Sequence, residues 1–535
     1  MKSTVSLWNV SAHPRYPLLQ SDLEVDVVIV GAGITGLTSA LLLADAGKRV
    51  AVLEARTIGC GVTGSTTAHL TEAVDTRYSK IESSFGREGA RLVAQSSRAA
   101  IERIGAIAAR HGADGAFTRV PGYLYAERDD TKGLETIARE LEASTRAGLT
   151  VSETSSVPLP FADRIGRAIR YEDQAQLDAG AYLDVLARAA TESGARIFEH
   201  SRVLAVDDRE PCVVHLESGA EVRGREVLFA TDAAPHRFFL QTKVHPYQSY
   251  VLAYDASAEL APGLFWDTAD PYHYIRSAEV NGTSYLVVGG SDHRTGTEHE
   301  TEKHYDDLAK YVFDRFGIRA AALRWSAQVY EPVDGLPFIG KRPSGEHVHY
   351  ATGFSGNGMT FGTIAAMITT DAVLGAKNPW AELYAASRIK PIASATTFVK
   401  ENLELPVHYV QDWVLGSAEA GSVEEVAPGD GKIVRVKGRR LAVYRDPKGS
   451  LHAVSPVCTH LGCHVAFNAA ERSWDCACHG SRFDTDGTVL HGPATAALAR
   501  RTLDEDAQMR PVRATEDEDD RSGIDIFGEP AYRRS

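Results

Sequence analysis

Two short segments that each pair a cysteine with a histidine constrain this chain most strongly. Cys458 and His460 form the first pair, and Cys476 and His479 form the second. Four of the six cysteines fall within 458–478, so we infer that the fold brings both segments together. Two thiolates and two imidazoles suit a two-iron cluster in which imidazoles replace thiolates on one iron, and such a cluster transfers electrons. Zinc is the alternative, because it also accepts two cysteines and two histidines, although zinc sites usually pair like ligands.

The two segments resemble the loops of a Rieske [2Fe-2S] domain, since Leu461-Gly462-Cys463 and Gly480-Ser481 complete them as in the respiratory type. The resemblance covers 415–510. It implies that Cys458 and Cys476 bind one iron, that His460 and His479 bind the other, that Cys463 and Cys478 form a disulfide, and that Ser481 donates to a cluster sulfur. Phe483 stands where high-potential members carry a tyrosine. We expect a lower potential, because a lost donor leaves the reduced, more negative cluster less stabilised.

A strand, a glycine turn and a helix follow one another near the start of the chain. The β-branched run 25–30 leads into Gly31-Ala32-Gly33-Ile34-Thr35-Gly36 and a Leu/Ala-rich helix, and a second apolar strand ends at Glu54. Gly31 allows the tight turn, Gly33 lets a pyrophosphate approach the helix N-terminus, and Gly36 permits close helix–strand packing. A carboxylate at Glu54 can bind both ribose hydroxyls, which predicts a dinucleotide and disfavours a 2′-phosphate. Residues 27–44 carry no charge, but their glycines favour this turn over a membrane span.

Two later segments favour FAD over NAD. The strand 227–232 resembles the one that returns beneath the flavin, and 336–340 with 353–360 resemble the closing signature of D-amino-acid oxidase-like flavoproteins. The resemblance to that family covers 24–380. In that family the glycine-rich turn opens a helix whose N-terminus stabilises the negative charge of reduced flavin. The loop 59–68 resembles the second flavin-contacting loop. The FAD contacts implied by the resemblance, beyond the first glycines and Glu54, are Ala55, Arg56, Gly64, Ser65, Thr66, Val203, Thr231, Gly353, Asn357, Gly358 and Met359.

Some relatives attach flavin covalently through cysteine or histidine, and Cys60 and His69 lie near the second loop. Neither residue stands in a diagnostic pattern, so we expect non-covalent FAD. The resemblances together imply an α/β fold, in which a Rossmann-type FAD-binding domain is interleaved with an α+β substrate domain and followed by a small all-β Rieske domain. We place the oxidoreductase unit at 1–400, with nucleotide-binding pieces near 24–75, 160–245 and 325–380. A linker at 401–414, the Rieske domain at 415–510 and an acidic, disordered tail at 511–535 follow.

Length and charge limit the remaining possibilities. A chain of 535 residues predicts about three structural units, and its net charge of −14 argues against nucleic acid or an anionic membrane surface as a partner. Residues 1–26 lack the pattern of a secretory signal, and only Cys60 and Cys212 lie outside the cluster segment. We therefore expect a cytoplasmic protein without a transmembrane segment. Residues 85–112 show the spacing of an amphipathic helix used for core packing.

The substrate site is the least constrained part of the sequence. Tyr274 and Arg276, in 272–276, resemble the substrate-binding tyrosine and arginine of amine-oxidising relatives. A guanidinium there would clamp a carboxylate through two parallel hydrogen bonds, although pairing with an acidic neighbour is an equal alternative. Tyr250 and His293 are weaker candidates that we expect to be packing groups.

We therefore predict an FAD-dependent dehydrogenase that oxidises an amine or amino-acid C–N bond. Its electrons would pass singly to a Rieske [2Fe-2S] cluster and on to an external acceptor, either a protein or a quinone, because a plain oxidase needs no cluster. One alternative is a reductase in which the cluster feeds the flavin. The other is a cluster with a structural or redox-sensing role. The sequence leaves the oligomeric state open.

Overall fold

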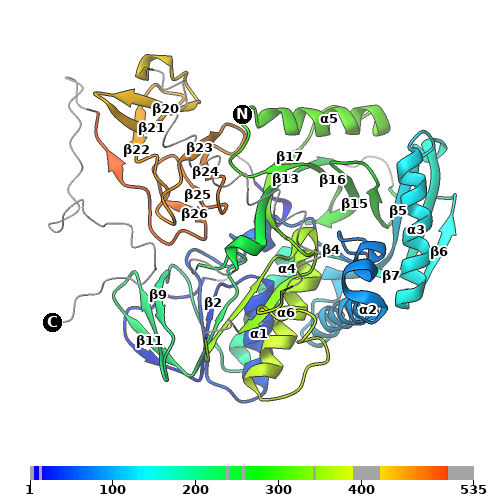
Figure 1. Ribbon diagram of the computed structural model, residues 1–535, viewed down its shortest axis with the longest axis horizontal. Coiled ribbons are helices and arrows are strands. Elements are labelled where there is room, and N and C mark those ends of the chain that lie inside the picture. The colour runs from blue at the N-terminus through cyan, green and yellow to red at the C-terminus, as the bar shows by residue number, and fades with distance from the viewer. Residues whose placement is uncertain are drawn as a thin grey trace.

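The computed structural model describes residues 5–10, 15–235, 240–255, 260–341, 345–389 and 422–503. The linker predicted at 401–414 and the tail predicted at 511–535 lie outside these ranges. The described chain forms three sheets from its first two thirds and two small sheets from its last part (Figure 1).

The first sheet has six strands and carries the predicted strand–turn–helix unit. Its order is β18-β19-β12-β2-β3-β8, and β12, β2, β3 and β8 run parallel. Buried strands of a parallel sheet are apolar throughout, as all four residues of β2 and of β3 are. The strands are β2 (Val27–Val30), β3 (Val50–Leu53), β8 (Arg196–Phe198), β12 (Glu226–Phe229), β18 (Phe338–Lys341) and β19 (Val348–Thr352). The sheet therefore gathers strands from four distant parts of the chain.

Three helices pack beside this sheet, as the lower centre of Figure 1 shows. They are α1 (Ile34–Asp45), α4 (Ala179–Glu192) and α6 (Gly358–Val373). Helix α1 lies between the other two and is buried almost all round. A helix without a polar face belongs inside a structure.

The second sheet is the largest and builds the other wall of the molecule. Its order is β17-β13-β16-β15-β14-β5-β7-β4, with β6 added beside β7. The strands are β4 (His69–Leu70), β5 (Phe117–Glu127), β6 (Val151–Thr154), β7 (Ile165–Leu177), β13 (Val244–Asp255), β14 (Leu264–Asp267), β15 (His273–Val280), β16 (Thr283–Arg294) and β17 (Leu323–Pro332). A smaller sheet, β1-β11-β10-β9, comprises β1 (Leu23–Glu24), β9 (Val203–Asp207), β10 (Cys212–Leu216) and β11 (Glu221–Gly224).

Helices α2 (Tyr78–Arg110), α3 (Thr131–Ala147) and α5 (Glu302–Phe316) accompany the large sheet. The helix predicted at 85–112 is present but begins earlier, at Tyr78. It is interrupted at Gly86, where φ is 75° and ψ is 174°. Only glycine adopts that backbone conformation readily, so the glycine at this position is what allows the break in the helix.

The last part of the chain is all β. One sheet, β20-β21-β22-β27, contains β20 (Gly431–Val436), β21 (Arg439–Arg445), β22 (Leu451–Val454) and β27 (Arg500–Arg501). The other, β23-β24-β25-β26, contains β23 (Val465–Asn468), β24 (Ser473–Cys476), β25 (Arg482–Phe483) and β26 (Val489–His491). The predicted hairpin turn at 446–449 joins β21 to β22. Trp474 and Phe483 are fully buried in the core of this part. The predicted fold class is confirmed.

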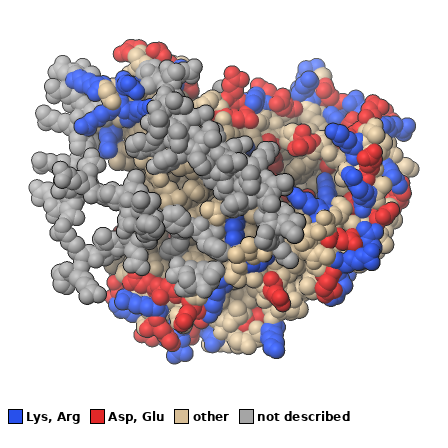
Figure 2. Space-filling view, viewed as in Figure 1, with Lys and Arg blue, Asp and Glu red and all other residues tan. Residues whose placement is uncertain are grey.

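Charged side chains of both signs are interspersed along the right-hand rim of the face in Figure 2. Within the described ranges, the helices are too short or too polar to cross a membrane.

Candidate functional site

One large cavity, of about 1630 Å³, lies where the two large sheets meet. Pockets for small ligands usually enclose roughly 300–1,000 Å³, so this one has room for a dinucleotide and a second molecule. Thirteen of the predicted site residues line it. They are Gly31, Gly33, Glu54, Ala55, Arg56, Ser65, Thr66, Val203, Thr231, Tyr274, Asn357, Gly358 and Met359.

The turn between β2 and α1 has the shape that a pyrophosphate needs. Gly31 has φ +105°, and a Cβ there would lie 2.6 Å from the carbonyl oxygen of Ala230. Helix α1 begins after Gly33 without a side-chain cap from that residue, and Ile34 N–H donates to Thr63 Oγ1 at 3.2 Å, so the following N–H groups of the first turn can face an anion. The carboxylate of Glu54 accepts from the backbone N–H groups of Ala32 and Arg56, both at 2.9 Å. These residues fit a dinucleotide whose ribose lies at the end of β3.

Three predicted glycines shape the walls without lining the cavity. A Cβ at Gly36 would lie 1.9 Å from the carbonyl oxygen of Gly31, and one at Gly64 would lie 1.6 Å from that of Gly59. Gly353 has φ +77°, which favours glycine, at the turn before α6. Their role is therefore close backbone packing.

Aromatic rings and two carboxylates form the opposite end of the cavity. Asp75, Trp266, Tyr272, Tyr274 and Asp292 line it there, together with His69 and Ser249. The hydroxyls of Ser249 and Tyr274 are 2.8 Å apart. Burial raises the pKa of Asp292 to about 7 and lowers that of His69 to about 3, so this histidine is neutral.

Arg276 lies elsewhere than we predicted. It is buried, and it does not line the cavity. Its guanidinium donates to the backbone carbonyls of Thr67, Ala68 and Leu177 at 2.9 to 3.2 Å, and to that of Ser277. All of these partners are structural, so the predicted carboxylate clamp receives no support.

Tyr250 and His293 also lie outside the cavity lining. The Tyr250 hydroxyl is 3.1 Å from His293 Nε2, and the two rings stack. His293, Glu298 and His304 group their ligand atoms within 4.8 Å. The histidine rings stack at 4.3 Å, so their in-plane lone pairs are parallel and do not converge on one ion.

The predicted cluster ligands come together in the all-β part. Cys458 and Cys476 are buried free thiols that share a hydrogen bond, which lowers the pKa of Cys458 and raises the pKa of Cys476. The rings of His460 and His479 lie 5.0 Å apart, edge to face. His479 Nδ1 is buried and has no hydrogen-bond partner among the described residues. Buried polar atoms rarely lack partners, so this nitrogen is free for a metal, and the set fits a two-iron cluster.

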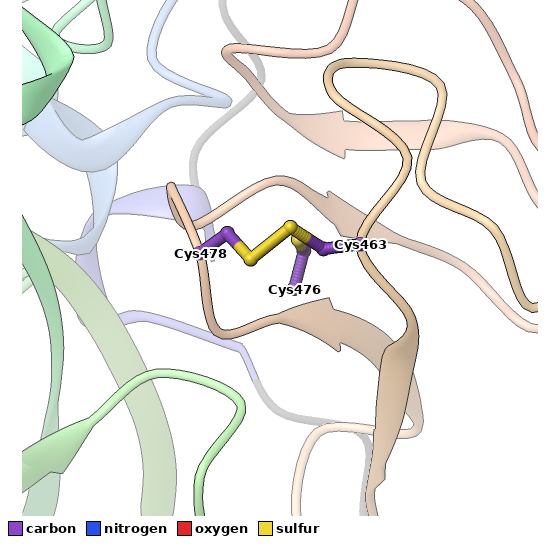
Figure 3. Close-up of side chains that lie close together, drawn as sticks. All are labelled: Cys463, Cys476 and Cys478. Carbon is purple, nitrogen blue, oxygen red and sulfur yellow. A yellow bond between two sulfur atoms is a disulfide. The ribbon is translucent and has the colours of Figure 1, made fainter. Parts of the chain in front are cut away.

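Cys463 and Cys478 form a disulfide with an S–S distance of 2.03 Å, as predicted. Figure 3 shows it joining the two ligand loops, with Cys476 beside it. Ser481 accepts from the backbone N–H of Ala494 and also bonds to the Cys458 thiol. The hydroxyl therefore lies beside a cluster ligand, and its bond to a cluster sulfur stays a prediction.

The histidine edge of this centre packs against the large sheet and the segments around it. Nε2 of His460 is 3.3 Å from Nε2 of Gln241, which precedes β13. On β17, Gln328 donates to the carbonyl of Gly480 at 2.9 Å, and Tyr330 donates to that of His479 at 3.2 Å. Residues 489–495 of the all-β part line the large cavity itself. The two candidate sites therefore share a wall.

Comparison with known proteins agrees with these two sites. Residues 26–372 match the model of the family described as FAD dependent oxidoreductase, and residues 417–502 match the Rieske [2Fe-2S] domain.

The chain belongs to the FAD dependent oxidoreductase family.

This FAD dependent oxidoreductase carries a Rieske [2Fe-2S] domain at its C-terminal side, and its cofactors are FAD and a [2Fe-2S] cluster. It is 32% identical over 507 residues to YhfW of Bacillus subtilis (strain 168), whose name describes a Rieske 2Fe-2S iron-sulfur protein. That match covers 93% of this chain and 97% of YhfW. It is also 26% identical to gamma-glutamylputrescine oxidoreductase of Escherichia coli (strain K12), over 70% of this chain and 89% of that protein.

Glycine oxidase from Geobacillus kaustophilus has a similar fold, with a TM-score of 0.59 at 19% identity. The match covers 69% of this FAD dependent oxidoreductase and 99% of the glycine oxidase.

Sequence reasoning missed several residues of both sites. Asp75 and Asp292 carried no distinctive signal, since Asp75 has charged and polar neighbours and Asp292 precedes the polar run 293–300. Gln241, Gln328 and Tyr330 carried none, because an interface between distant segments leaves no local pattern. Cys60, one of two residues considered for covalent flavin attachment, is exposed and does not line the cavity, whereas His69 does.

Proposed function

We propose that this protein oxidises the C–N bond of a small amine and passes the electrons one at a time to its Rieske cluster, from which an external acceptor takes them. The cavity residues named above would hold FAD, and Cys458, Cys476, His460 and His479 would hold the cluster. The substrate loses two electrons and two protons as its C–N bond becomes C=N, and bound FAD supplies the two-electron acceptor.

One observation carries this proposal: the histidine edge of the cluster site contacts the unit that contains the FAD cavity. Tyr330 bonds to His479 and to Gly492, and Gly492 lines the cavity. His491, also in the lining, lies 3.5 Å from Asp232, which follows the flavin-side strand β12. These contacts support electron transfer between the two centres within one chain.

The chemistry assigned to the cavity is supported by the relatives. Gamma-glutamylputrescine oxidoreductase and glycine oxidase are named for nitrogen-bearing substrates. In this chain, Trp266, Tyr272 and Tyr274 would exclude water from the reacting bond and orient the substrate. The open N-terminus of α6, beginning at Gly358, would stabilise negative charge that develops on the cofactor.

Anaerobic reduction tests the proposal. Purified holoenzyme is mixed with a panel of amines and amino acids without oxygen, and the flavin absorbance and the EPR signal of the reduced cluster are followed together. We expect flavin bleaching followed by the cluster signal. Bleached flavin with a cluster that never gives a signal would sink the proposed circuit, and a flavin that dithionite reduces before the cluster would favour the reverse flow.

A further inference from the structure

The end of the cavity opposite the dinucleotide turn is built around two acidic side chains. Asp292 stands on β16, and Asp75 follows β4. Both line the cavity, and the charge of Asp75 acts on Asp292. Burial raises the pKa of each carboxyl, which means that the surroundings provide less solvation than water does.

The two carboxylates lack a full set of partners within the protein. The backbone N–H of Gly356 donates to Asp75 at 2.5 Å, and Arg77 acts on the same carboxylate. A hydrogen bond from Ser249 reaches Asp292, but Oδ1 of Asp292 is buried and has no partner among the described residues. Arg77 acts on Asp75 and His273 acts on Asp292, so few basic groups face the two acids. A buried carboxylate without a full counter-charge is costly.

The other cationic groups that line the cavity lie at its dinucleotide end. Within the described part of the chain, the arginines that line the cavity are Arg56, Arg202 and Arg209, which accompany Glu54 and the adenine-side strand β9. Arg276 is turned into the protein and bonded to backbone carbonyls. A substrate carboxylate at the acidic end would thus meet two like charges, and the guanidinium that acts on Asp75, that of Arg77, does not line the cavity.

Aromatic rings surround the same place, and the fold makes room for them. A Cβ at Gly289 would lie 2.1 Å from the Tyr274 ring, and one at Gly122 would lie 2.9 Å from the Trp266 ring. A Cβ at Gly356 would lie 2.7 Å from the Asp75 carboxylate and 3.0 Å from the Tyr272 hydroxyl. Rings of this kind attract cations through their faces.

We propose that the substrate binds as an ammonium cation against Asp292 and Asp75, within the ring wall of Trp266, Tyr272 and Tyr274, and that it carries no carboxylate on the carbon next to nitrogen. The substrate class is thus an amine and not an α-amino acid. This inference rests on the proposed C–N oxidation at the same cavity.

Matched substrate pairs test the inference. Each pair is an amine and the α-amino acid that differs only by a carboxylate: putrescine and ornithine, benzylamine and phenylglycine, tyramine and tyrosine. We expect at least one amine to bleach the flavin about 100-fold faster than its amino acid, since like charges brought together cost several kcal/mol. Amino acids that react faster than their amines would overturn the inference and leave C–N oxidation standing. If neither class bleaches the flavin, both proposals fail.

A binding measurement gives a second readout that needs no turnover. Tetramethylammonium is titrated into the oxidised holoenzyme, and its Kd is read from the change in the flavin spectrum. Asp292→Asn should raise this Kd about 10- to 100-fold, because it removes the charge but keeps the shape. Asp255→Asn, on an exposed carboxylate at the end of β13, is the matched control and should leave Kd unchanged. FAD content, measured by absorbance, verifies folding, and an unchanged Kd in folded Asp292→Asn would overturn the inference.

Discussion

The hydroxyl of Tyr330, on the flavoprotein sheet, donates to the backbone carbonyl of the cluster histidine His479 at 3.2 Å. The same hydroxyl lies 3.2 Å from the carbonyl of Gly492, which lines the FAD cavity. One side chain therefore touches a cluster loop and the wall of the flavin site. It holds the two units in register, and loss of that contact should affect electron transfer without affecting substrate oxidation.

Tyr330→Phe tests this directly. The substitution removes the hydroxyl and keeps the ring, at a cost of about 0.5–1.5 kcal/mol per hydrogen bond. We expect the cluster to be reduced several-fold more slowly by substrate, measured by freeze-quench EPR, while flavin bleaching keeps its rate. Tyr285→Phe, at the start of β16 away from this contact, is the control. Equal cluster rates in the two variants would contradict a role for this hydroxyl.

Arg276→Met tests whether Arg276 has a structural role or binds a substrate carboxylate. The backbone carbonyls of Thr67, Ala68 and Leu177 would lose this donor inside the protein, and each buried group left unsatisfied costs about 1–3 kcal/mol, although that of Ala68 still accepts from Leu177 N–H. We expect a clear fall in the thermal midpoint of flavin release and an unchanged preference between amines and amino acids. Arg225→Met, on an exposed arginine, should change neither quantity. A selective rise in KM for amino acids, with an unchanged thermal midpoint, would instead support Arg276 as a carboxylate clamp.

The first βαβ unit and the cluster loops were predictable because each depends on neighbours in the sequence. Gly36 is required by the carbonyl of Gly31 in the same turn, and the Cys458 and Cys476 loops repeat a ligand pattern, although Gly31 is also required by Ala230 from a distant strand. Thirteen predicted site residues accordingly line one cavity. The cofactor family could thus be predicted from local chemistry.

Arg276 shows where such reasoning stops. Its partners come from 67–68 and 177, far away in the chain, and a resemblance in the strand 272–276 says nothing about which way the guanidinium turns. Asp292 was missed for the same reason, because only the folded sheet places it beside Asp75 and Tyr274. Substrate chemistry depends on such long-range juxtapositions, which a single sequence does not encode locally.

The disulfide should determine how long the cluster survives heating. Cys463 and Cys478 are 15 residues apart in the chain, and a loop of that length is stabilised by about 3 kcal/mol when closed. In a Cys463→Ser, Cys478→Ser double variant we expect the visible absorbance of the cluster to disappear at a lower temperature. Cys60→Ser, on an exposed free thiol, is the control. A double variant that keeps its cluster as long as the unmodified protein would show that the cluster alone holds the loops.

Cation binding should depend on pH through Asp292. Its pKa is raised from 3.8 to about 7 by burial, with Asp75 adding to the effect and Ser249 and His273 opposing it. The carboxyl is charged above pH 7 and neutral below it, so the Kd of tetramethylammonium should rise up to tenfold per unit as pH falls below 7. This ligand does not titrate. Asp292→Asn should flatten the profile, and a profile that keeps its slope would assign the titration to Asp75.

Two glycines with the same backbone conformation allow a clash with the flavoprotein sheet to be distinguished from local backbone strain. Gly480 and Gly462 both have φ +79°, and both lie in the cluster loops. Alanine at either position costs about 1–2 kcal/mol in the left-handed region. A Cβ at Gly480 would also lie 2.2 Å from Gln328 Nε2 and 2.5 Å from the Cβ of Pro246, whereas one at Gly462 would meet nothing within 4 Å.

Gly480→Ala should therefore push the cluster module away from the flavoprotein sheet, and Gly462→Ala should not. We expect the cluster of Gly480→Ala to assemble, as its dithionite-reduced EPR signal would verify, but to be reduced by substrate at least about tenfold more slowly than that of Gly462→Ala. The clash is steric and lies at the shared wall, so flavin bleaching should remain fast in both variants. Equal cluster reduction rates would mean that the contact at Gly480 does not control the distance between the two centres, and the proposed intramolecular transfer would lose its structural basis.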